Sequence, residues 1–381
     1  MPYASHYVAC IQCPAINDVY HSACDPKGSA HSCDGFLDFK GRLSIPKAAL
    51  FLDDFWIRGA IWGSNVQGAQ AEGLRMHDGG VDCERGESRL TPASRFTLDY
   101  LGSPPELADY VTTFYHFRCD ELQINDIQPA AVGHLVLFAY GKGVMSRPGG
   151  GTDPSYEVNL LTPFAEAAPF AVEGPFHAIG AALTPLGWAA LTGLCAKTHA
   201  NRLYDADSWL DSDLATRSHA LCAAYREERM DGKACARELG MIIRGALRAV
   251  NPGHERLIAV TNAWLARALV PDLGALYADS GYSRRQTQRL VERYFGLSPI
   301  ALRRKYRALR IAALLSLPKL TDEYEAEIAE AFYDQSHMIR ELRLFAGRTP
   351  ARLSDGDSPI LNEMLDTKNL RELGNGNQES C

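Results

Sequence analysis

The sequence predicts an α+β protein, in which a mixed strand and helix domain is followed by an all-α domain. Three observations carry this prediction. The run 132–140 has the composition of a strand, apolar residues recur at helical spacing from Pro185 onward, and 254–352 is almost entirely helical in pattern. With 381 residues the chain exceeds what one hydrophobic core usually organises, so more than one domain is expected.

The composition is that of an ordinary globular protein, with 46% hydrophobic and 22% charged residues. No run reaches the roughly 18 apolar residues of a membrane helix, and no basic and then apolar leader opens the chain. Ten cysteines are too dilute to build a disulfide scaffold. We therefore expect a cytoplasmic protein without a membrane partner.

The net charge of −7 is unevenly distributed along the chain. Residues 256–352 contain 16 Lys and Arg against 10 Asp and Glu, so this segment carries +6 and the remainder −13. A basic segment joined to an acidic body indicates one module that meets phosphate groups and another that does not.

Four segments of the chain differ in composition and in predicted structure. Residues 1–99 are irregular, 100–250 form a strand-then-helix domain, 254–352 form the helical domain, and 353–381 are a polar tail predicted to be disordered. The boundary is placed at 251–253, because its Asn-Pro-Gly sequence stops helices.

Strands and helices are expected in order along the body. The strand at 132–140 is predicted to stop at the glycines of 141–143, a loop is predicted at 148–151, and a second strand at 178–183. Apolar spacing then predicts helices over 186–197, 207–226 and 234–250.

Capping residues and helix breakers delimit six helices in the C-terminal region. Ser283, Ser298 and Asp334 are predicted N-caps, and Gly347 and Pro350 end the pattern. The predicted helices cover 255–269, 272–278, 283–295, 299–317, 321–330 and 335–345.

A short helix, a tight turn containing Gly281 and a capped basic helix are the signature of a helix-turn-helix unit. Four side chains share one side of the second helix and are expected to pack inward: Thr287, Leu290, Val291 and Tyr294. The candidate DNA contacts are Ser283, Arg284, Arg285, Gln286, Gln288 and Arg289. Arg suits the acceptors of guanine and Gln suits adenine in the major groove, whereas the alternative is a solvated basic helix.

The helix predicted from Pro299 is crowded with basic residues, namely Arg303, Arg304, Lys305, Arg307 and Arg310. Its buried stripe is predicted to be Leu302, Tyr306, Leu309 and Ala313. Arg303 and Arg304 join the candidate DNA contacts. About 19 residues would span about 28 Å, which can separate two DNA-reading units by about one turn of the duplex.

A second unit repeats this layout. Met338, Leu342 and Phe345 are predicted to face inward from its last helix. The candidate DNA contacts on the outer side and at the helix N-terminus are Gln335, Ser336, His337 and Arg340.

Five motifs within 256–352 resemble the DNA-binding domain of the AraC/XylS family of bacterial transcription regulators. They are GYSRRQTQR at 281–289, FGLSP at 295–299, YRALR at 306–310, DQSHMIR at 334–340 and GRTP at 347–350. The resemblance covers about a quarter of the chain. It implies two helix-turn-helix units joined by one long helix, double-stranded promoter DNA as a partner, and contact with RNA polymerase.

Three features depart from the family pattern. Thr287 stands where the family usually has Leu, and Ala331 stands where the second turn normally has Gly, which adopts positive φ at little cost. The helix at 321–330 is acidic and would repel phosphate if it faced DNA. The second unit is therefore expected to bind DNA more weakly than the first.

The body resembles, more faintly, the N-terminal domain that accompanies this module in one branch of such regulators. The matching segments are 103–111, Tyr115, 129–140 and 180–188. The resemblance implies that 100–250 senses an unknown small-molecule effector or forms a homodimer. Three histidines among apolar neighbours, His116, His134 and His177, are expected to be core or surface residues rather than ligand contacts.

Cys10, Cys13, Cys24 and Cys33 are candidate zinc ligands by residue type, with His21 and His31 nearby. A second close pair is lacking, so we predict no metal and no cofactor. Residues 1–75 have an alternative interpretation as an upstream extension that is not translated in the native protein, because Met76 precedes the first family-like sequence.

The sequence thus predicts a sequence-specific transcription regulator of the AraC type, an activator controlled by an effector or a partner. An alkylation-repair methyl-acceptor using the N-terminal cysteines is one alternative, although no Pro-Cys-His-Arg motif is present. A protein-interaction module with a weakened DNA domain is another, based on Ala331 and the acidic helix. Gly-x-Ser-x-Gly, P-loop and His-Glu-x-x-His motifs are absent, so no enzyme is predicted.

Overall fold

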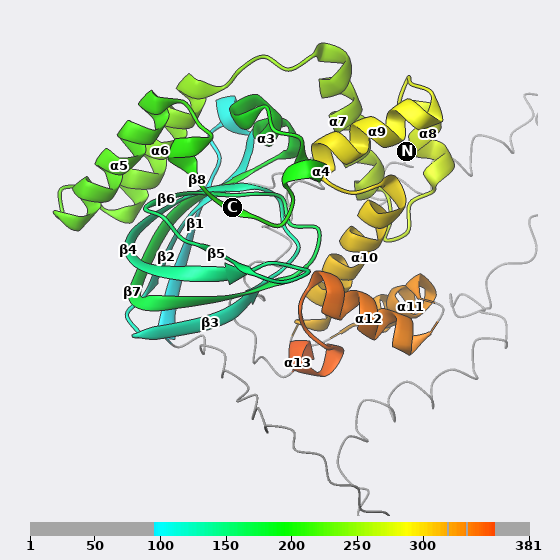
Figure 1. Cartoon of the computed structure of the whole chain (residues 1–381). Coiled ribbons are helices and arrows are strands. Elements are labelled where there is room, and N and C mark those ends of the chain that lie inside the picture. The colour runs from blue at the N-terminus through cyan, green and yellow to red at the C-terminus, as the bar shows by residue number, and fades with distance from the viewer. Residues whose placement is uncertain (1–94, 318–319, 333, 355–381) are drawn as a thin grey trace, which may run out of the picture. The chain divides into compact units, whose positions relative to one another are not determined.

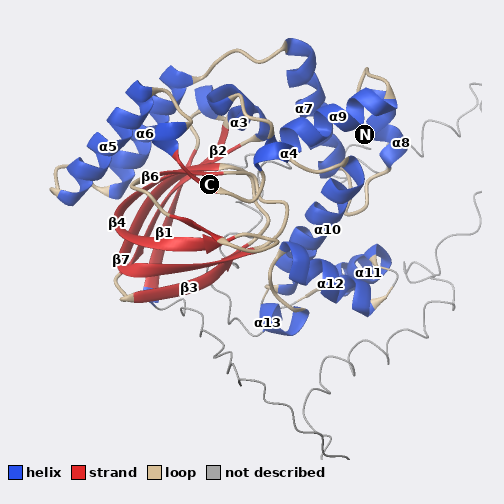
Figure 2. Ribbon diagram, in the orientation of Figure 1, coloured by secondary structure: helices blue, strands red, loops and turns tan. Residues whose placement is uncertain are grey.

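The computed structural model describes residues 95–317, 320–332 and 334–354 (Figure 1). The candidate zinc ligands Cys10, Cys13, Cys24 and Cys33, the proposed extension at 1–75 and the tail from 355 onward lie outside these residues. The described chain is a domain built on an antiparallel sheet, followed by a helical region (Figure 2). The predicted α+β fold class is therefore confirmed.

Every strand pair in the sheet is antiparallel. The sheet runs in the order β1-β2-β7-β4-β6-β8, with β3 also paired to β7 and β5 to β4. The strands are β1 (Phe96–Gly102), β2 (Val111–Cys119), β3 (Gln123–Gln128), β4 (His134–Ser146), β5 (Thr152–Pro154), β6 (Val158–Leu161), β7 (Ala168–Leu183) and β8 (Leu203–Asp205).

The glycines at 141–143 do not end the strand, contrary to the prediction. β4 continues to Ser146, and its register against β7 shifts on both sides of Tyr140. Gly141 has a φ of +85°, and a Cβ there would lie 2.8 Å from the carbonyl oxygen of Pro175. Glycine thus lets two backbones approach at a bulge, so the strand bends where the sequence indicated a stop.

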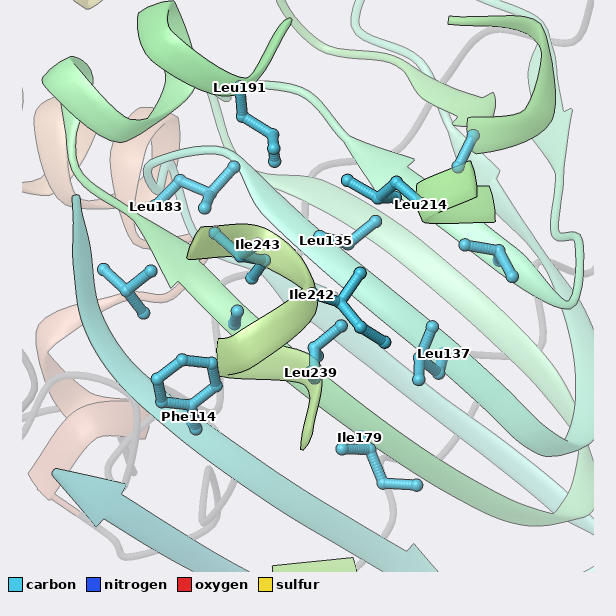
Figure 3. Packing of buried hydrophobic residues seen from close by; sticks show 14 of the residues in the cluster. Phe114, Leu135, Leu137, Ile179, Leu183, Leu191, Leu214, Leu239, Ile242 and Ile243 are labelled. Atoms are coloured by element: carbon cyan, nitrogen blue, oxygen red, sulfur yellow. The ribbon is translucent and has the colours of Figure 1, made fainter. Parts of the chain in front are cut away.

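Helices cover one face of the sheet. They are α5 (Ser212–Arg226) and α6 (Gly232–Ala246), and the domain also contains α3 (Pro185–Thr192), α4 (Ala196–His199) and short 3-10 turns at Pro105–Leu107 and Ala206–Ser208. The single helix predicted over 186–197 is divided, because Gly193 at a φ of +69° caps the end of α3. Ile242 and Leu239 of α6 pack against the strand residues Leu135 and Phe114 (Figure 3).

Strand alternation gives the sheet two different faces. Leu135 and Leu137 of β4 belong to the core shared with α5 and α6, whereas Val136 packs in a separate cluster with Phe117 and Phe176. Successive strand side chains point to opposite faces, so this second cluster lies on the face away from α5 and α6.

The helical region contains α7 (Pro252–Ala266), α8 (Leu273–Asp279), α9 (Arg284–Phe295), α10 (Pro299–Leu315), α11 (Asp322–Ala331), α12 (Gln335–Phe345) and α13 (Pro350–Ser354). Asn251 and Pro252, predicted to break helices, instead begin α7, because Asn251 accepts hydrogen bonds from the backbone N–H groups of Gly253 and His254. Pro350 likewise begins α13 instead of ending the pattern. None of the described helices is long and apolar enough to span a membrane.

Candidate nucleic-acid interface

The first helix-turn-helix unit consists of α8, a turn and α9. Gly281 has a φ of +70° in the turn, and the Ser283 hydroxyl caps α9 by accepting a hydrogen bond from the N–H of Gln286. The four side chains predicted to pack inward are all buried: Thr287, Leu290, Val291 and Tyr294. The helical face assignment for this unit is therefore confirmed.

The opposite side of α9 is exposed. Arg285, Gln288 and Arg289 all lie in it, and the structure records no hydrogen bond or ion pair between them and other described residues. The Arg284 guanidinium is exposed and lies 5.0 Å from the centre of the Tyr277 ring. The surface made by Arg285, Gln288 and Arg289 is called the α9 reading face below.

Thr287 is suited to its place although the family usually has Leu there. The residue is fully buried, and its hydroxyl lies 2.8 Å from the Ser280 hydroxyl and donates to the carbonyl oxygen of Ser283 at 3.1 Å. Ser280 is itself buried before the turn. A polar pair therefore replaces an apolar contact inside this unit, with its hydrogen bonds satisfied.

The basic residues of α10 bond to the protein, which the crowding of charge did not predict. Arg303 donates to the carbonyl oxygen of Pro271 at 3.2 Å, and Arg310 donates to that of Leu265 at 2.7 Å. Arg304 and Arg307 each make an ion pair of 2.6 Å with Glu341, whose side chain is 1% exposed. These cations therefore hold α10 against its neighbours, and their crowding is weak evidence for DNA contact.

The same helix has 17 residues where about 19 were predicted, and spans about 25 Å. Leu302, Tyr306 and Leu309 are buried as predicted, and Ala313 is partly buried. Arg303 and Arg304 remain candidate contacts only through the exposed part of each side chain.

The second unit consists of α11 and α12. Met338, Leu342 and Phe345 are buried as predicted. Three candidate contacts, Gln335, Ser336 and Arg340, are exposed, while His337 is partly buried with its ring 5.8 Å from that of Phe332. Asp334 caps α12 by accepting from the N–H of His337 at 2.7 Å.

Ala331 closes α11 without a left-handed residue. Its side chain is buried, and the next residue, Phe332, is extended with a φ of −128°. The acidic side chains of α11 are exposed, namely Asp322, Glu323, Glu325, Glu327 and Glu330. Such a surface would repel a phosphate backbone brought close to it.

The connecting helix α10 and the second unit are both bonded to the sheet domain. Lys305 is 3% exposed, and its Nζ donates to the carbonyl oxygens of Ala131 at 3.1 Å and Phe164 at 2.9 Å. The backbone N–H of Ala130 donates to the carbonyl oxygen of Phe345 at 2.7 Å. Lys305 was counted from the sequence among the basic residues that crowd this helix, but it is buried at this junction.

An apolar cavity of about 190 Å³ lies on the sheet face away from α5 and α6. Its wall includes Val136, Phe138 and Phe176 from the sheet, Ala130 and Ala131 from the junction, and Leu309 from α10. The wall therefore contains residues that touch the helical region directly. The sequence analysis did not predict this cavity. One available signal was the presence of polar residues, Asp126 and Gln128, at alternate positions of β3, all on the buried face of the strand.

The three histidines lie in the sheet domain. His134 is buried in the cavity wall, where its Nδ1 shares a hydrogen bond of 3.2 Å with the Tyr115 hydroxyl, and burial lowers its pKa to about 4. His116 and His177 both lie 2.9 Å from the Tyr225 hydroxyl. In the part of the chain that the structure describes, no three His, Cys, Asp or Glu side chains group to hold a metal ion.

The described chain thus has two helix-turn-helix units on one connecting helix, preceded by a domain with an antiparallel sheet, which is the arrangement that the resemblance to the AraC/XylS family implies. No protein-family model and no curated protein matches the chain.

The solved structures that are similar to it include those of ToxT and CuxR. ToxT of Vibrio cholerae O395 has 9% identity and a TM-score of 0.37, covering 69% of this chain and 98% of that chain. ToxT of Vibrio cholerae strain SCE256, bound to an unsaturated fatty acid, has 8% identity and a TM-score of 0.36 over 73% of this chain and 98% of its own. The AraC-like transcriptional activator CuxR has 12% identity and a TM-score of 0.25, over 57% of this chain and 87% of its own.

Proposed function

We propose that this protein is a sequence-specific DNA-binding transcription regulator, and that a small molecule held in the apolar cavity controls its binding to DNA. The observation that carries the proposal is the α9 reading face. Arg285, Gln288 and Arg289 project from a capped helix whose other side is buried in a helix-turn-helix core. An α-helix fits the major groove, where Arg and Gln side chains distinguish base pairs.

Control by an effector is supported by the position of the cavity. Leu309 and Ala131 line it, and Ala131 also accepts the hydrogen bond from Lys305 of α10. A molecule that contacts these residues interacts with the helix that joins the two units. If it prefers one arrangement of α10, it shifts the population toward that arrangement and changes the spacing of the two units.

The resemblance to the AraC/XylS family also implies a homodimer, contact with RNA polymerase and activation of transcription. These remain predictions, as does action in the bacterial cytoplasm, where promoter DNA would be reached. The α9 reading face does not depend on any of them.

Capture of genomic DNA fragments by the purified full-length chain would test the proposal, followed by affinity measurement on the enriched sequence and on random DNA. Arg289→Ala should weaken specific binding by about 5- to 150-fold, the range of one bidentate base contact, and change random-DNA binding much less. Arg256→Ala, an exposed arginine on α7, is the matched control and should leave both affinities unchanged.

The result that would overturn the proposal is equally specific. Fragments recovered without any shared sequence, or equal specific affinities for the wild type and Arg289→Ala, would remove the α9 reading face from DNA recognition. A protein-interaction module with a decayed DNA domain predicts that outcome.

A further inference from the structure

The chemical character of the cavity wall indicates what kind of molecule it holds. Most of its surface is made by aliphatic and aromatic side chains such as Leu98, Phe170 and Val172. Among the described residues that line it there is no Lys, Arg, Asp or Glu. For comparison, an engineered apolar cavity of about 150 Å³ binds benzene, so this cavity of about 190 Å³ has room for an aromatic ring.

Most polar side chains in the wall already have partners within the protein. Tyr115 and His134 bond to each other, and the Nδ2 of Asn159 donates to the carbonyl oxygen of Tyr156 at 2.6 Å. The hydroxyls of Thr112 and Ser155 bond to backbone groups at 3.2 and 2.7 Å. Because these polar groups bond within the protein, the wall offers a ligand a mainly apolar surface.

Gln128 carries a buried polar atom of the wall that has no recorded partner among the described residues. Its side chain is buried, at 8% exposure of the residue, and its Nε2 has no hydrogen-bond partner in the described part of the protein. Gln128 lies on β3 four residues after the buried Ile124, so the two side chains point to the same face of the sheet, which is the face of the cavity. A buried amide N–H without an acceptor is costly, and a ligand acceptor would remove that cost.

The same wall disfavours an anion. A carboxylate taken from water into an apolar site needs a cation or several donors to offset its lost hydration. Lys305 lies next to the wall residue Ala131, but its Nζ already donates to the carbonyl oxygens of Ala131 and Phe164. His134 is neutral at physiological pH, because burial lowers its pKa to about 4.

We infer that the cavity binds an uncharged, mainly hydrophobic molecule carrying one hydrogen-bond acceptor, such as a carbonyl oxygen, which accepts from Nε2 of Gln128. This inference rests on the proposed role of the cavity as the effector site, and it names the chemical class of that effector.

Three probes of similar size and different polarity test the inference by calorimetric titration of the full-length chain. Methyl 3-phenylpropanoate is a neutral ester, 4-phenylbutanoate is its isomer as a carboxylate, and butylbenzene has no acceptor. We expect the ester to bind at least tenfold more tightly than the carboxylate at pH 7.5. Gln128→Leu should weaken ester binding about 3- to 10-fold and leave butylbenzene binding unchanged or tighter.

Gln123→Leu is the matched control, since Gln123 is exposed at the other end of the same strand. It should change no affinity, and unchanged binding of butylbenzene shows that the cavity of the Gln128 variant is intact. Equal affinity for the carboxylate and the ester, equal effects of the two Gln variants, or failure of all three probes to bind would each overturn the inference.

This titration contains no DNA, so its outcome is separate from that of the proposed function. A preparation that selects specific DNA and fails the ester test refutes the ligand class alone. A preparation that passes the ester test and selects no DNA sequence contradicts the regulator proposal alone.

Discussion

Arg348 and Asp126 lie 222 positions apart in the sequence and form a buried ion pair, with side-chain exposures of 0% and 1%. Arg348 follows α12 in the GRTP motif, and Asp126 is on β3, two residues before Gln128. This ion pair links the end of the second helix-turn-helix unit to β3, the strand that carries Gln128 in the cavity wall. The helical region and the cavity are thus joined through neighbouring residues of one strand.

Removal of one partner should destabilise the protein strongly. Arg348→Met leaves the Asp126 carboxylate buried without its cation, for which about 3–5 kcal/mol of unfolding free energy is the expected loss. Urea denaturation of both proteins measures it.

The double variant Arg348→Met with Asp126→Leu separates pairing from packing. It should recover most of the lost stability, because neither charge is then buried alone. Arg340→Ala, at an exposed position of α12, should change stability by less than about 0.5 kcal/mol. A single variant as stable as the wild type would show that the pair does not hold this junction.

Replacement of Thr287 by leucine, the residue that the AraC/XylS family usually has there, should lower the stability of the first unit, because Thr287 bonds to Ser280. Thr287→Leu adds volume at a site with no exposure and leaves the Ser280 hydroxyl without one of its partners. We expect a loss of about 1–3 kcal/mol, measured by thermal or urea unfolding. Adding Ser280→Ala should recover part of it, whereas additive losses would contradict coupling between these residues.

Acid should weaken the sheet domain through His134. The pKa of His134 is about 4 in the folded protein and its ordinary value, 6.5, in the unfolded chain, so between these pH values the unfolded chain binds a proton that the folded chain excludes. Above pH 6.5 both forms are neutral and the contribution vanishes. The unfolding free energy should therefore fall on acidification by up to about 1.4 kcal/mol per pH unit from this residue.

Denaturation of His134→Gln between pH 7.5 and 4.5 measures that contribution. The variant should lose stability with a shallower slope than the wild type. His199→Gln, at a half-buried histidine beside Tyr204, is the control and should retain the wild-type slope. Parallel slopes for the wild type and His134→Gln would assign the acid sensitivity elsewhere.

Specific DNA binding should be strongly salt dependent, because Lys and Arg contacts release counterions from the duplex. Arg340 is exposed on α12 and its Nε donates to the carbonyl oxygen of Ser336 at 3.2 Å. If Arg340 contacts phosphate, Arg340→Ala should lower the slope of log affinity against log salt by about one. Titrations between 50 and 200 mM salt on the captured sequence measure it, and an unchanged slope would exclude this contact.

Helix boundaries and helix faces in the C-terminal helical region could be predicted because their signals are local. Ser283 and Asp334 bond to N–H groups three residues ahead, and Leu290 and Tyr294 lie one helical turn apart. The boundaries that were predicted wrongly lie at residues that can either end an element or continue or begin one. Asn251 and Pro252 can stop one helix and begin the next, and Gly141 can end a strand or bend it.

The sequence by itself determined the class of fold, the two helix-turn-helix units and the exposed surface of Arg285, Gln288 and Arg289, since each depends on spacing within a few residues. Only the tertiary structure decided the roles of Lys305, Arg348 and Gln128. Lys305 meets Ala131 across 174 positions, and Gln128 faces a cavity whose wall includes Leu309. Whether a cation faces DNA or a buried carbonyl depends on which distant segments fold against it, and local periodicity carries no information about them.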